Sequence, residues 1–296
     1  MKKNTIPRLN RGGSIYSYWF LAPAFAVFIV FFLVPMAISL YFSLTVWDFS
    51  SSRFVGLENY KMFFSEYSLS IGLRNTFIYA ILTSGLKVVL AFLIAVFLTG
   101  HIRTKNALRS IVFFPNLVSA VAIGIAFKAM LHPTKGILNQ LITWLGGTGV
   151  DWLGNKNIAL FSVIFTDVWK GLSIATVIYI AGISSIDKSY YEAADMDGAS
   201  AWQKLRDITI PLTASSRNTV IILSFIGGLR SFELIWTMTG GGPGFATDVL
   251  SSVIYKQYAQ GYYGLSTAGN VIMLAITALL AFPLQRYLNK KEEALH

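Results

Sequence analysis

Two long apolar runs are joined by the segment Glu192-Ala-Ala-Asp-Met-Asp-Gly-Ala-Ser-Ala-Trp-Gln-Lys-Leu-Arg-Asp-Ile-Thr-Ile-Pro211. A connection of this kind need only be short and soluble, but this one is rich in small residues, with four alanines and one glycine, Gly198. We interpret it as two short helices hinged at Gly198 and ended by Pro211, because glycine adopts the left-handed conformation freely and proline interrupts a helix. Small side chains also let another backbone approach closely. The segment is therefore expected to pass mechanical force to a soluble partner protein.

The amino-acid composition of the whole chain indicates which class of protein contains this segment. Of the 296 residues, 54% are hydrophobic and only 13% are charged, and the mean hydropathy is +0.58. Soluble globular proteins have about 25% charged residues, so the chain is predicted to be an integral membrane protein. The net charge of +10 does not indicate nucleic-acid binding, because the basic residues lie in short loops between apolar runs. Cysteine is absent, which excludes disulfides and thiol chemistry in this chain.

Six segments have the roughly 20 mostly apolar residues that a membrane-spanning helix needs. They cover residues 18–44, 75–100, 110–131, 158–182, 218–240 and 268–288. We interpret the first as a retained span, because its uncharged stretch is longer than the apolar part of a signal peptide. The prediction is an all-α integral membrane protein with a transmembrane domain over 18–290. A segment 1–17 precedes this domain and a tail 291–296 follows it, both expected in the cytoplasm.

Lysine and arginine are unevenly distributed between these spans. Fourteen of them lie on one side of the predicted membrane and six in the remaining loops. The fourteen are four in residues 1–17, three in 101–109, four in 183–217 and three from Arg286 onward. Cytoplasmic loops carry the excess of Lys and Arg in membrane proteins. We therefore expect an N-in/C-in protein whose 183–217 loop lies in the cytoplasm.

Ionisable residues inside the spans are costly, on the order of 3 kcal/mol at a helix centre. Asp167 and Lys170 are three residues apart in the fourth span, and Arg230 and Glu233 repeat this spacing in the fifth. Residues at this spacing share a helix face, so each pair is expected to neutralise itself partly. Lys87 has no acid within one helical turn, and its partner must lie on another helix, with Asp167 or Glu233 as candidates.

We interpret these charges as the lining of a polar pathway; the alternative is that they only hold helices together. Nearby aromatic residues offer flat faces to sugar rings, whereas Asn270 is expected to serve helix packing. The candidate pathway residues are Lys87, Asp167, Trp169, Lys170, Arg230, Phe232, Glu233 and Trp236.

The sequence lacks the usual marks of an enzyme. No phosphate-binding loop of the form G-x-x-x-x-G-K-[ST] occurs. The three histidines, His101, His132 and His296, are scattered without the spacing of metal ligands. We expect no catalytic residue, no metal site and no cofactor in this chain.

Several motifs together resemble one known family. The run from Glu192 to Gly198 followed by Ile208-Thr-Ile-Pro211 resembles the EAA loop of binding-protein-dependent ABC importer permeases. Further matches point to the carbohydrate branch, the group related to the maltose and glycerol-phosphate permeases. These matches are Gly56-Leu-Glu-Asn-Tyr60, Asn75-Thr76, Asp167-Val-Trp-Lys170, and Thr239-Gly-Gly-Gly-Pro243 with Thr247. They cover nearly the whole chain.

The resemblance implies that the loop docks into a cleft on an ATPase subunit. The coupling residues that it implies are Glu192, Ala193, Ala194, Asp197, Gly198, Leu205 and Pro211. Leu205 and Ile210 depart from the Phe and Leu that are usual in the family, and both remain apolar. The helix dipole supports the placement of Glu192 in the first helix of this loop, because a carboxylate is favourable in the early turns of a helix.

By the same resemblance, the fold is that of an ABC type I importer permease in a bacterial cell membrane, working by alternating access. Its partners are a second homologous permease subunit, two ATPase subunits that hold ATP and Mg, and an extracytoplasmic sugar-binding protein. The cargo is a sugar, with an oligosaccharide favoured. Two alternatives remain: an ion- or proton-coupled secondary transporter that uses Asp167, Glu233 and the intramembrane lysines as a relay, and a scaffold or receptor subunit without a pathway.

Overall fold

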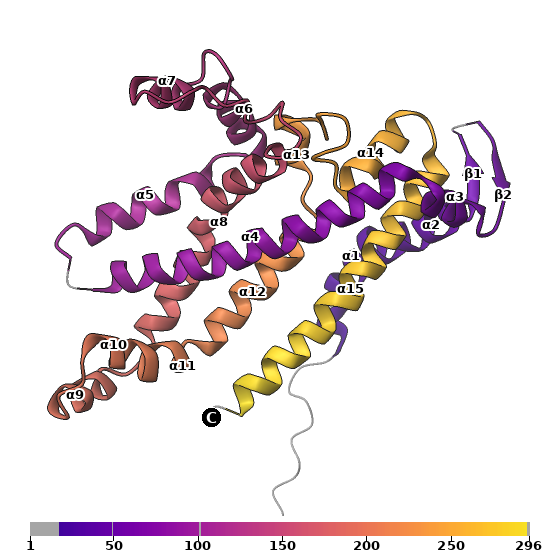
Figure 1. Ribbon diagram of the computed structural model, residues 1–296. Helices are drawn as coiled ribbons and strands as arrows, with labels where there is room; N and C mark the ends of the chain where they lie inside the picture. The colour runs from indigo at the N-terminus through magenta and orange to yellow at the C-terminus, as the bar shows by residue number, and fades with distance from the viewer. Residues whose placement is uncertain (1–17, 49, 101, 295–296) are drawn as a thin grey trace, which may run out of the picture.

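The computed structural model describes residues 18–48, 50–100 and 102–294, and it is almost entirely helical (Figure 1). Three helices form its centre: α4 (Tyr67–Thr99), α8 (Ala159–Ser184) and α12 (Ala214–Leu229). Helix α4 packs against both of the others. Small residues allow this approach, since Ala91 and Ala95 of α4 and Ala175 of α8 are buried in one cluster. Lipid is as apolar as these side chains, so close packing has to supply the attraction.

A second group of elements covers one end of α4. The apolar core there combines α3 (Glu58–Ser65), α14 (Leu250–Ala259) and the start of α15 (Tyr263–Glu293). A short antiparallel hairpin of β1 (Thr45–Trp47) and β2 (Ser52–Phe54) lies beside them, with Val46 opposite Arg53. Helix α7 (Ile137–Trp144) lies apart from this group, at the top left of the view in Figure 1, whereas α9 to α11 lie at the bottom.

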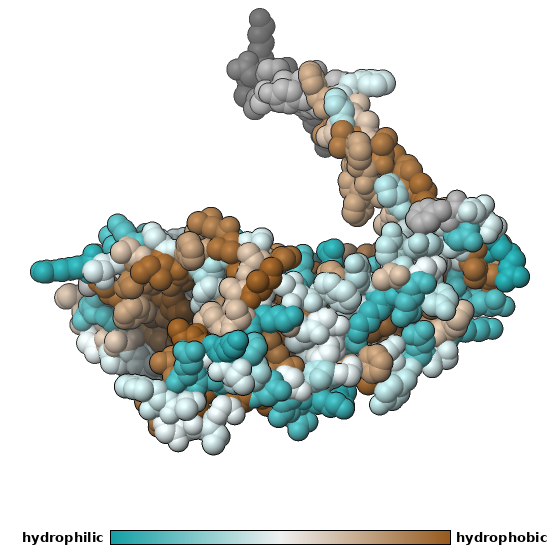
Figure 2. All heavy atoms as spheres, turned by 90° about the horizontal axis from the view of Figure 1, so that it is seen from above, coloured by the Kyte–Doolittle hydropathy of each residue, from teal (hydrophilic) through white to brown (hydrophobic). Residues whose placement is uncertain are grey.

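The first predicted span is one continuous helical run, Trp19–Ser43. It consists of a 3-10 turn (Tyr18–Leu21), α1 (Ala22–Phe28), a π-helical turn (Ile29–Leu33) and α2 (Val34–Ser43). Only α2 packs on the body, against α15, and the apolar side chains of α1 are exposed. Figure 2 shows this run as an arm that stands away from the rest. Its apolar surface suits contact with lipid or with another membrane protein.

Four helices in the described ranges are long and apolar enough to cross a membrane. They are Trp19–Ser43, Tyr67–Thr99, Ala159–Ser184 and Tyr263–Glu293. The chain is thus a multi-pass helical membrane protein. Two of the six predicted spans are not single helices, and both differences bear on function.

The prediction of one helix over residues 110–131 is wrong. The chain forms α5 (Lys105–Leu117) and α6 (Ala120–Met130), which meet at an angle of 100°. Val118 is extended, and the Ser119 side chain accepts a hydrogen bond from the Ala122 N–H at 3.2 Å. Ser119 therefore acts as the cap that begins a new helix. The two helices together make a fifth crossing if they are counted as one bent span.

The prediction of one helix over residues 218–240 is also wrong. Helix α12 ends at Leu229, and α13 (Glu233–Met238) begins only after Phe232, whose backbone lies outside the helical region. The Ser231 carbonyl at this break accepts a hydrogen bond from the Ser251 hydroxyl of α14. A side chain thus satisfies a backbone group that the break leaves free, which makes a broken helix tolerable within a membrane.

Candidate functional site

The segment between α8 and α12 forms a helical hairpin. Helix α9 (Lys188–Met196) begins at Asp187, whose carboxylate accepts a hydrogen bond from the Ser189 N–H at 2.9 Å. This bond, with a smaller contribution from the Ser189 hydroxyl, lowers the pKa of Asp187 below its usual value of 3.8. After α9 the chain turns at Gly198, where φ is +73°. The predicted hinge at Gly198 is confirmed, because this is the left-handed conformation that residues with a side chain avoid.

The second arm of the hairpin starts with a capping box. Ser200 and Gln203 exchange side-chain to backbone hydrogen bonds at the start of α10 (Ala201–Lys204). Two contacts then tie this arm to α9: Lys204 Nζ lies 2.6 Å from Asp195 Oδ1, and the Tyr191 and Thr209 hydroxyls are 2.9 Å apart. The Lys204–Asp195 pair is exposed and sets the shape of the hairpin more than its stability, whereas the Thr209 end of the hydroxyl contact is buried.

Pro211 does not end a helix, and this part of the prediction is wrong. A π-helical turn (Leu205–Thr209) runs directly into α11 (Ile210–Leu212), which contains Pro211 in its first turn. Pro211 thus lies inside a continuous helical run, and the wider π-helical turn directly before it accommodates a residue without an N–H. The direction changes instead at Thr213, whose hydroxyl donates to the Thr209 carbonyl at 2.7 Å. Helix α12 begins at the next residue, so movement of the hairpin reaches α12 without an intervening loop.

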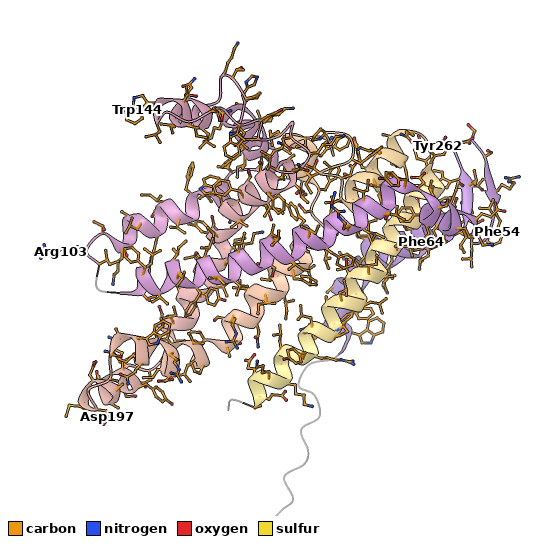
Figure 3. The ribbon with its side chains drawn as sticks, in the orientation of Figure 1. Phe54, Phe64, Arg103, Trp144, Asp197 and Tyr262 are labelled. Carbon is orange, nitrogen blue, oxygen red and sulfur yellow. The ribbon has the colours of Figure 1, made fainter. Side chains whose placement is uncertain are left out.

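The predicted coupling residues lie together on this hairpin. Glu192, Ala193, Asp197 and Gly198 are exposed, whereas Ala194, Leu205 and Pro211 are partly buried. Glu192 lies in the second turn of α9, while the capping position belongs to Asp187. Figure 3 shows Asp197 at the outer tip.

Sequence reasoning missed three large apolar side chains on the same hairpin. Met196 is 89% exposed and Trp202 is 66% exposed, and Tyr190 is exposed beside them. Exposed apolar residues on a polar hairpin are typical of a surface that a partner covers. These apolar residues in an otherwise polar loop were the sequence feature that could have predicted this surface.

Lys87 of α4 and Asp167 of α8 form an ion pair between helices. Lys87 Nζ lies 2.7 Å from Asp167 Oδ2, Lys87 is buried and Asp167 is partly exposed. The stem of Lys87 fills the space that a side chain at Gly171 would occupy. Of the two candidate partners of Lys87, the structure selects Asp167. The expected pairing of Asp167 with Lys170 is wrong, because Gly171 gives Lys87 direct access to the carboxylate and no described contact joins Asp167 to Lys170.

Arg230 and Glu233 are likewise not an ion pair within the described part of the chain. The break between α12 and α13 separates them, so they do not share a helix face as expected. Arg230 instead lines a cavity of about 300 Å³ where this break meets α14 and α15. Glu233 opens α13, where a carboxylate interacts favourably with the N-terminal end of the helix dipole.

Aromatic rings gather at the same cavity. Phe232 lines it and stacks on Trp236, with ring centres 5.7 Å apart and planes inclined by 18°. Tyr255 of α14 lies 5.2 Å from Phe232 and 4.6 Å from Trp236. The predicted ring Trp169 is placed elsewhere, 5.2 Å from Phe127 of α6. The structure therefore joins Phe232 and Trp236 beside this cavity, whereas Trp169 packs against Phe127 and does not line the cavity.

Seven residues that line this cavity were not among the predicted site residues, including two tyrosines and Asn270. Tyr255 and Tyr258 line it from one face of α14, a segment that lies outside the predicted spans. Their spacing of three residues was the only signal. Asn270 of α15, expected to serve helix packing, lines the cavity and is exposed.

Two of the motifs singled out in the sequence meet next to this cavity. The Asn75 amide of α4 donates to the carbonyls of Ala246 and Asp248, at 3.0 and 2.9 Å. Thr76 accepts a hydrogen bond from the Leu250 N–H at 2.9 Å. The glycine-rich turn that starts at Thr239 is closed by the Thr239–Thr247 hydroxyl contact at 2.7 Å. These bonds hold the start of α14 against α4 and so position the ring of Tyr255.

A multi-pass helical protein with an exposed helical hairpin at one end and an aromatic cavity toward the other has the build expected of a transporter's membrane subunit. Comparison with known proteins makes the class specific. The chain belongs to the family described as binding-protein-dependent transport system inner membrane component, which matches residues 87–293.

Relatives and solved structures agree with this membership. The chain is 30% identical to a trehalose/maltose transport system permease protein of Thermococcus litoralis, over 95% of this chain and 96% of the relative. It is 31% identical to a diacetylchitobiose uptake system permease protein of Streptomyces coelicolor, over 88% of this chain and 79% of the relative. The fold matches a chain of a bacterial ABC transporter involved in alginate import with a TM-score of 0.78 at 24% identity, covering 94% of both.

The chain is therefore the permease subunit of a binding-protein-dependent ABC importer, and ATP hydrolysis is carried out by a separate chain in such systems. This assignment replaces the two alternatives of an ion-coupled carrier and a scaffold without a pathway.

Proposed function

We propose that this permease imports a disaccharide or a longer oligosaccharide. The observation that carries the proposal is the cavity where Phe232, Tyr255 and Tyr258 present aromatic rings. Sugar rings have apolar C–H faces that pack on aromatic rings, while their hydroxyl groups need hydrogen-bond partners. Ser251 and Asn270 offer such partners on the cavity wall. The relatives named for trehalose and maltose and for diacetylchitobiose support the same class of cargo.

The proposed route runs from this cavity along the polar residues of α4, α8 and the α12–α13 break. It comprises Lys87, Asp167, Trp169, Lys170, Arg230, Phe232, Glu233 and Trp236. Trp236 supports the cavity rings from behind by stacking on Phe232. The Lys87–Asp167 pair joins α4 to α8 beside the route, and Asp167 is exposed enough to contact a passing solute.

The hairpin of α9 and α10 is proposed to dock on an ATPase subunit. Glu192, Ala193, Ala194, Asp197, Gly198, Leu205 and Pro211 form the coupling element. When ATP binding moves the ATPase subunits, the hairpin moves with them, and the helical path through the π-turn and α11 carries this movement into α12. Because α12 ends at the cavity, the displacement alternately opens and closes access to it.

The assembly is proposed to be that of a type I importer in a bacterial cell membrane. It contains a second, homologous permease, two ATPase subunits that hold ATP and Mg, and an extracytoplasmic sugar-binding protein; this chain itself holds no cofactor. Six crossings result if α5 with α6 and α12 with α13 are each counted as one broken span. The excess of Lys and Arg supports an N-in/C-in orientation, and the end of α15 lies on the same side as α9 to α11 (Figure 1).

The test is uptake by the complete transporter in proteoliposomes, with its binding protein and ATPase subunits. We expect ATP-dependent uptake of at least one sugar among maltose, trehalose and diacetylchitobiose. Phe232→Ala and Tyr255→Ala should each lower apparent affinity about five- to tenfold, since one aromatic contact contributes about 1 kcal/mol. Trp144→Ala is the control, because Trp144 is 82% exposed on α7, away from the cavity. ATP-dependent uptake of other solutes but of no saccharide would reject the proposal.

A further inference from the structure

A second cavity, of about 540 Å³, lies between α12 and α15 at the end of the molecule that carries the coupling hairpin. It is separate from the aromatic cavity and shares no lining residue with it. One face of each helix lines it: Ser215, Asn218, Thr219 and Ile222 of α12, and Gln285, Asn289, Glu292 and Glu293 of α15. Seven of these eight residues are polar or charged.

Asn218 is the buried member of this set, with 4% of its surface exposed. Its amide nitrogen donates to Glu292 Oε2 at 2.7 Å and to the Leu288 carbonyl at 3.3 Å. Its Oδ1 atom is buried and has no hydrogen-bond partner among the described residues. Buried polar atoms are nearly always hydrogen-bonded, so this acceptor is available to a donor from outside the chain, a water molecule or a ligand hydroxyl. Since the nitrogen is held by α15, the oxygen is the atom left for that donor.

The lining restricts the chemistry of the ligand. An anion would find the carboxylates of Glu292 and Glu293 and no lysine or arginine on the wall. A cation would use those carboxylates but would make no use of the amide N–H groups of Gln285 and Asn289, which are exposed and would stay bonded to water. A neutral polyhydroxylated molecule uses both kinds of group, because each hydroxyl donates one hydrogen bond and accepts others. The volume is within the usual range for a small-molecule site.

We infer that this cavity binds a saccharide on the coupling-hairpin side of the membrane, from the same chemical class as the cargo. The inference rests on the proposed sugar cargo and on the proposed orientation, which together make the ligand the imported product. A bound saccharide bridges the first turns of α12 and the last turns of α15. Ser215 lies two residues after Thr213, the point at which the hairpin passes into α12. Occupancy therefore restrains the helix that the hairpin must move, and accumulated product slows the transport cycle.

The experiment uses the complete transporter in lipid nanodiscs, which leave both faces accessible. ATP hydrolysis is driven by saturating binding protein loaded with whichever sugar of the uptake panel is transported best. The same free sugar is then added in the millimolar range. We expect inhibition in the wild type, and a half-inhibitory concentration about fivefold to tenfold higher in Gln285→Ala and Asn289→Ala, the loss of about one hydrogen bond each.

Lys291→Ala is the matched control, because Lys291 is exposed in the same turns of α15 but does not line the cavity. Its half-inhibitory concentration should equal that of the wild type. Spermidine and glycerol phosphate serve as cationic and anionic probes. If Gln285→Ala relieves inhibition by spermidine or glycerol phosphate but not inhibition by the sugar, the inference is wrong. It is also wrong if the sugar inhibits Gln285→Ala and Asn289→Ala as strongly as the wild type. These outcomes leave sugar uptake intact, whereas a transporter that takes up no sugar removes the proposed function and this inference together.

Discussion

Lys87 of α4 bonds to Asp167 of α8 across 2.7 Å, and the bond is possible because residue 171 of α8 is a glycine. Any side chain at Gly171 would occupy the place of the Lys87 stem. The pair sits between two of the helices that form the centre of the protein. Its charges are neutralised between helices, whereas the sequence spacing pointed to neutralisation within one helix.

Variants of the Lys87–Asp167 pair can show whether the pair lines the transport route or only holds α4 to α8. Lys87→Met leaves a mostly buried carboxylate without a partner and should destabilise the protein by about 3 kcal/mol. The double variant Lys87→Met with Asp167→Leu should recover most of that stability, as replaced ion pairs often do. Thermal unfolding in detergent measures both. Lys170→Met is the control and should change stability little.

Transport by the stable double variant then decides between the two roles. If the pair lines the route, uptake stays low although the protein is folded. Wild-type uptake by the double variant would show that the pair only holds α4 to α8.

Gly198 offers a test of coupling with a built-in control for strain. Gly198→Asp places a side chain at φ +73°, and Gly261→Asp does the same at φ +88°, with open space around both glycines. Each should cost about 1 to 2 kcal/mol of stability for the same conformational reason. Only Gly198→Asp should uncouple ATP hydrolysis from uptake, because Gly261 adjoins Tyr262, far from Asp197 (Figure 3). Equal transport by the two variants in proteoliposomes would contradict the coupling assignment.

The exposed apolar residues of the hairpin should contribute to ATPase docking. Trp202→Ala and Met196→Ala remove side chains that are largely exposed in the isolated chain, so neither should shift the unfolding temperature. Buried aromatic anchors contribute about 2 kcal/mol or more to protein interfaces. Trp202→Ala should therefore weaken ATPase binding by at least about tenfold, as measured by co-purification and titration.

Trp144→Ala again serves as the comparison, because Trp144 is also largely exposed and lies at the opposite end (Figure 3). If both tryptophan variants retain the ATPase equally well, Trp202 is not part of the docking surface.

The start of α9 should depend on pH. The Ser189 N–H holds the pKa of Asp187 below its usual 3.8, so the carboxylate binds fewer protons in the folded hairpin than in the unfolded one. Its contribution to stability is therefore fully present above about pH 3.8 and is lost as the pH falls through the lower folded value. Hydrogen exchange of α9 at a series of acidic pH values measures this loss.

Asp187→Asn keeps the capping oxygen but cannot titrate. The α9 exchange of this variant should show no Asp187-dependent step over the same range. The same acid-dependent step in both proteins would exclude Asp187 as its cause.

Local chemistry explains what could be foreseen. The hinge at Gly198 follows from a backbone conformation that glycine adopts without strain. The membrane location follows from composition, and Lys87 required an acidic partner because a lone intramembrane charge is costly. The breaks at Ser119 and at Arg230–Phe232 could not be foreseen, because hydropathy averages over a window and does not register where one cap or one side-chain hydrogen bond interrupts a helix.

The amino-acid order alone therefore established a membrane protein with a helical turn at Gly198 between two apolar runs, since composition and glycine geometry are local properties. The folded arrangement alone established that Asp167 rather than Glu233 partners Lys87, and that Tyr255 and Asn270 join Phe232 at one cavity. Those contacts join helices far apart in the chain. They depend on the close approach that small residues such as Gly171 permit and on the hydrogen bonds of Asn75, which no local pattern encodes.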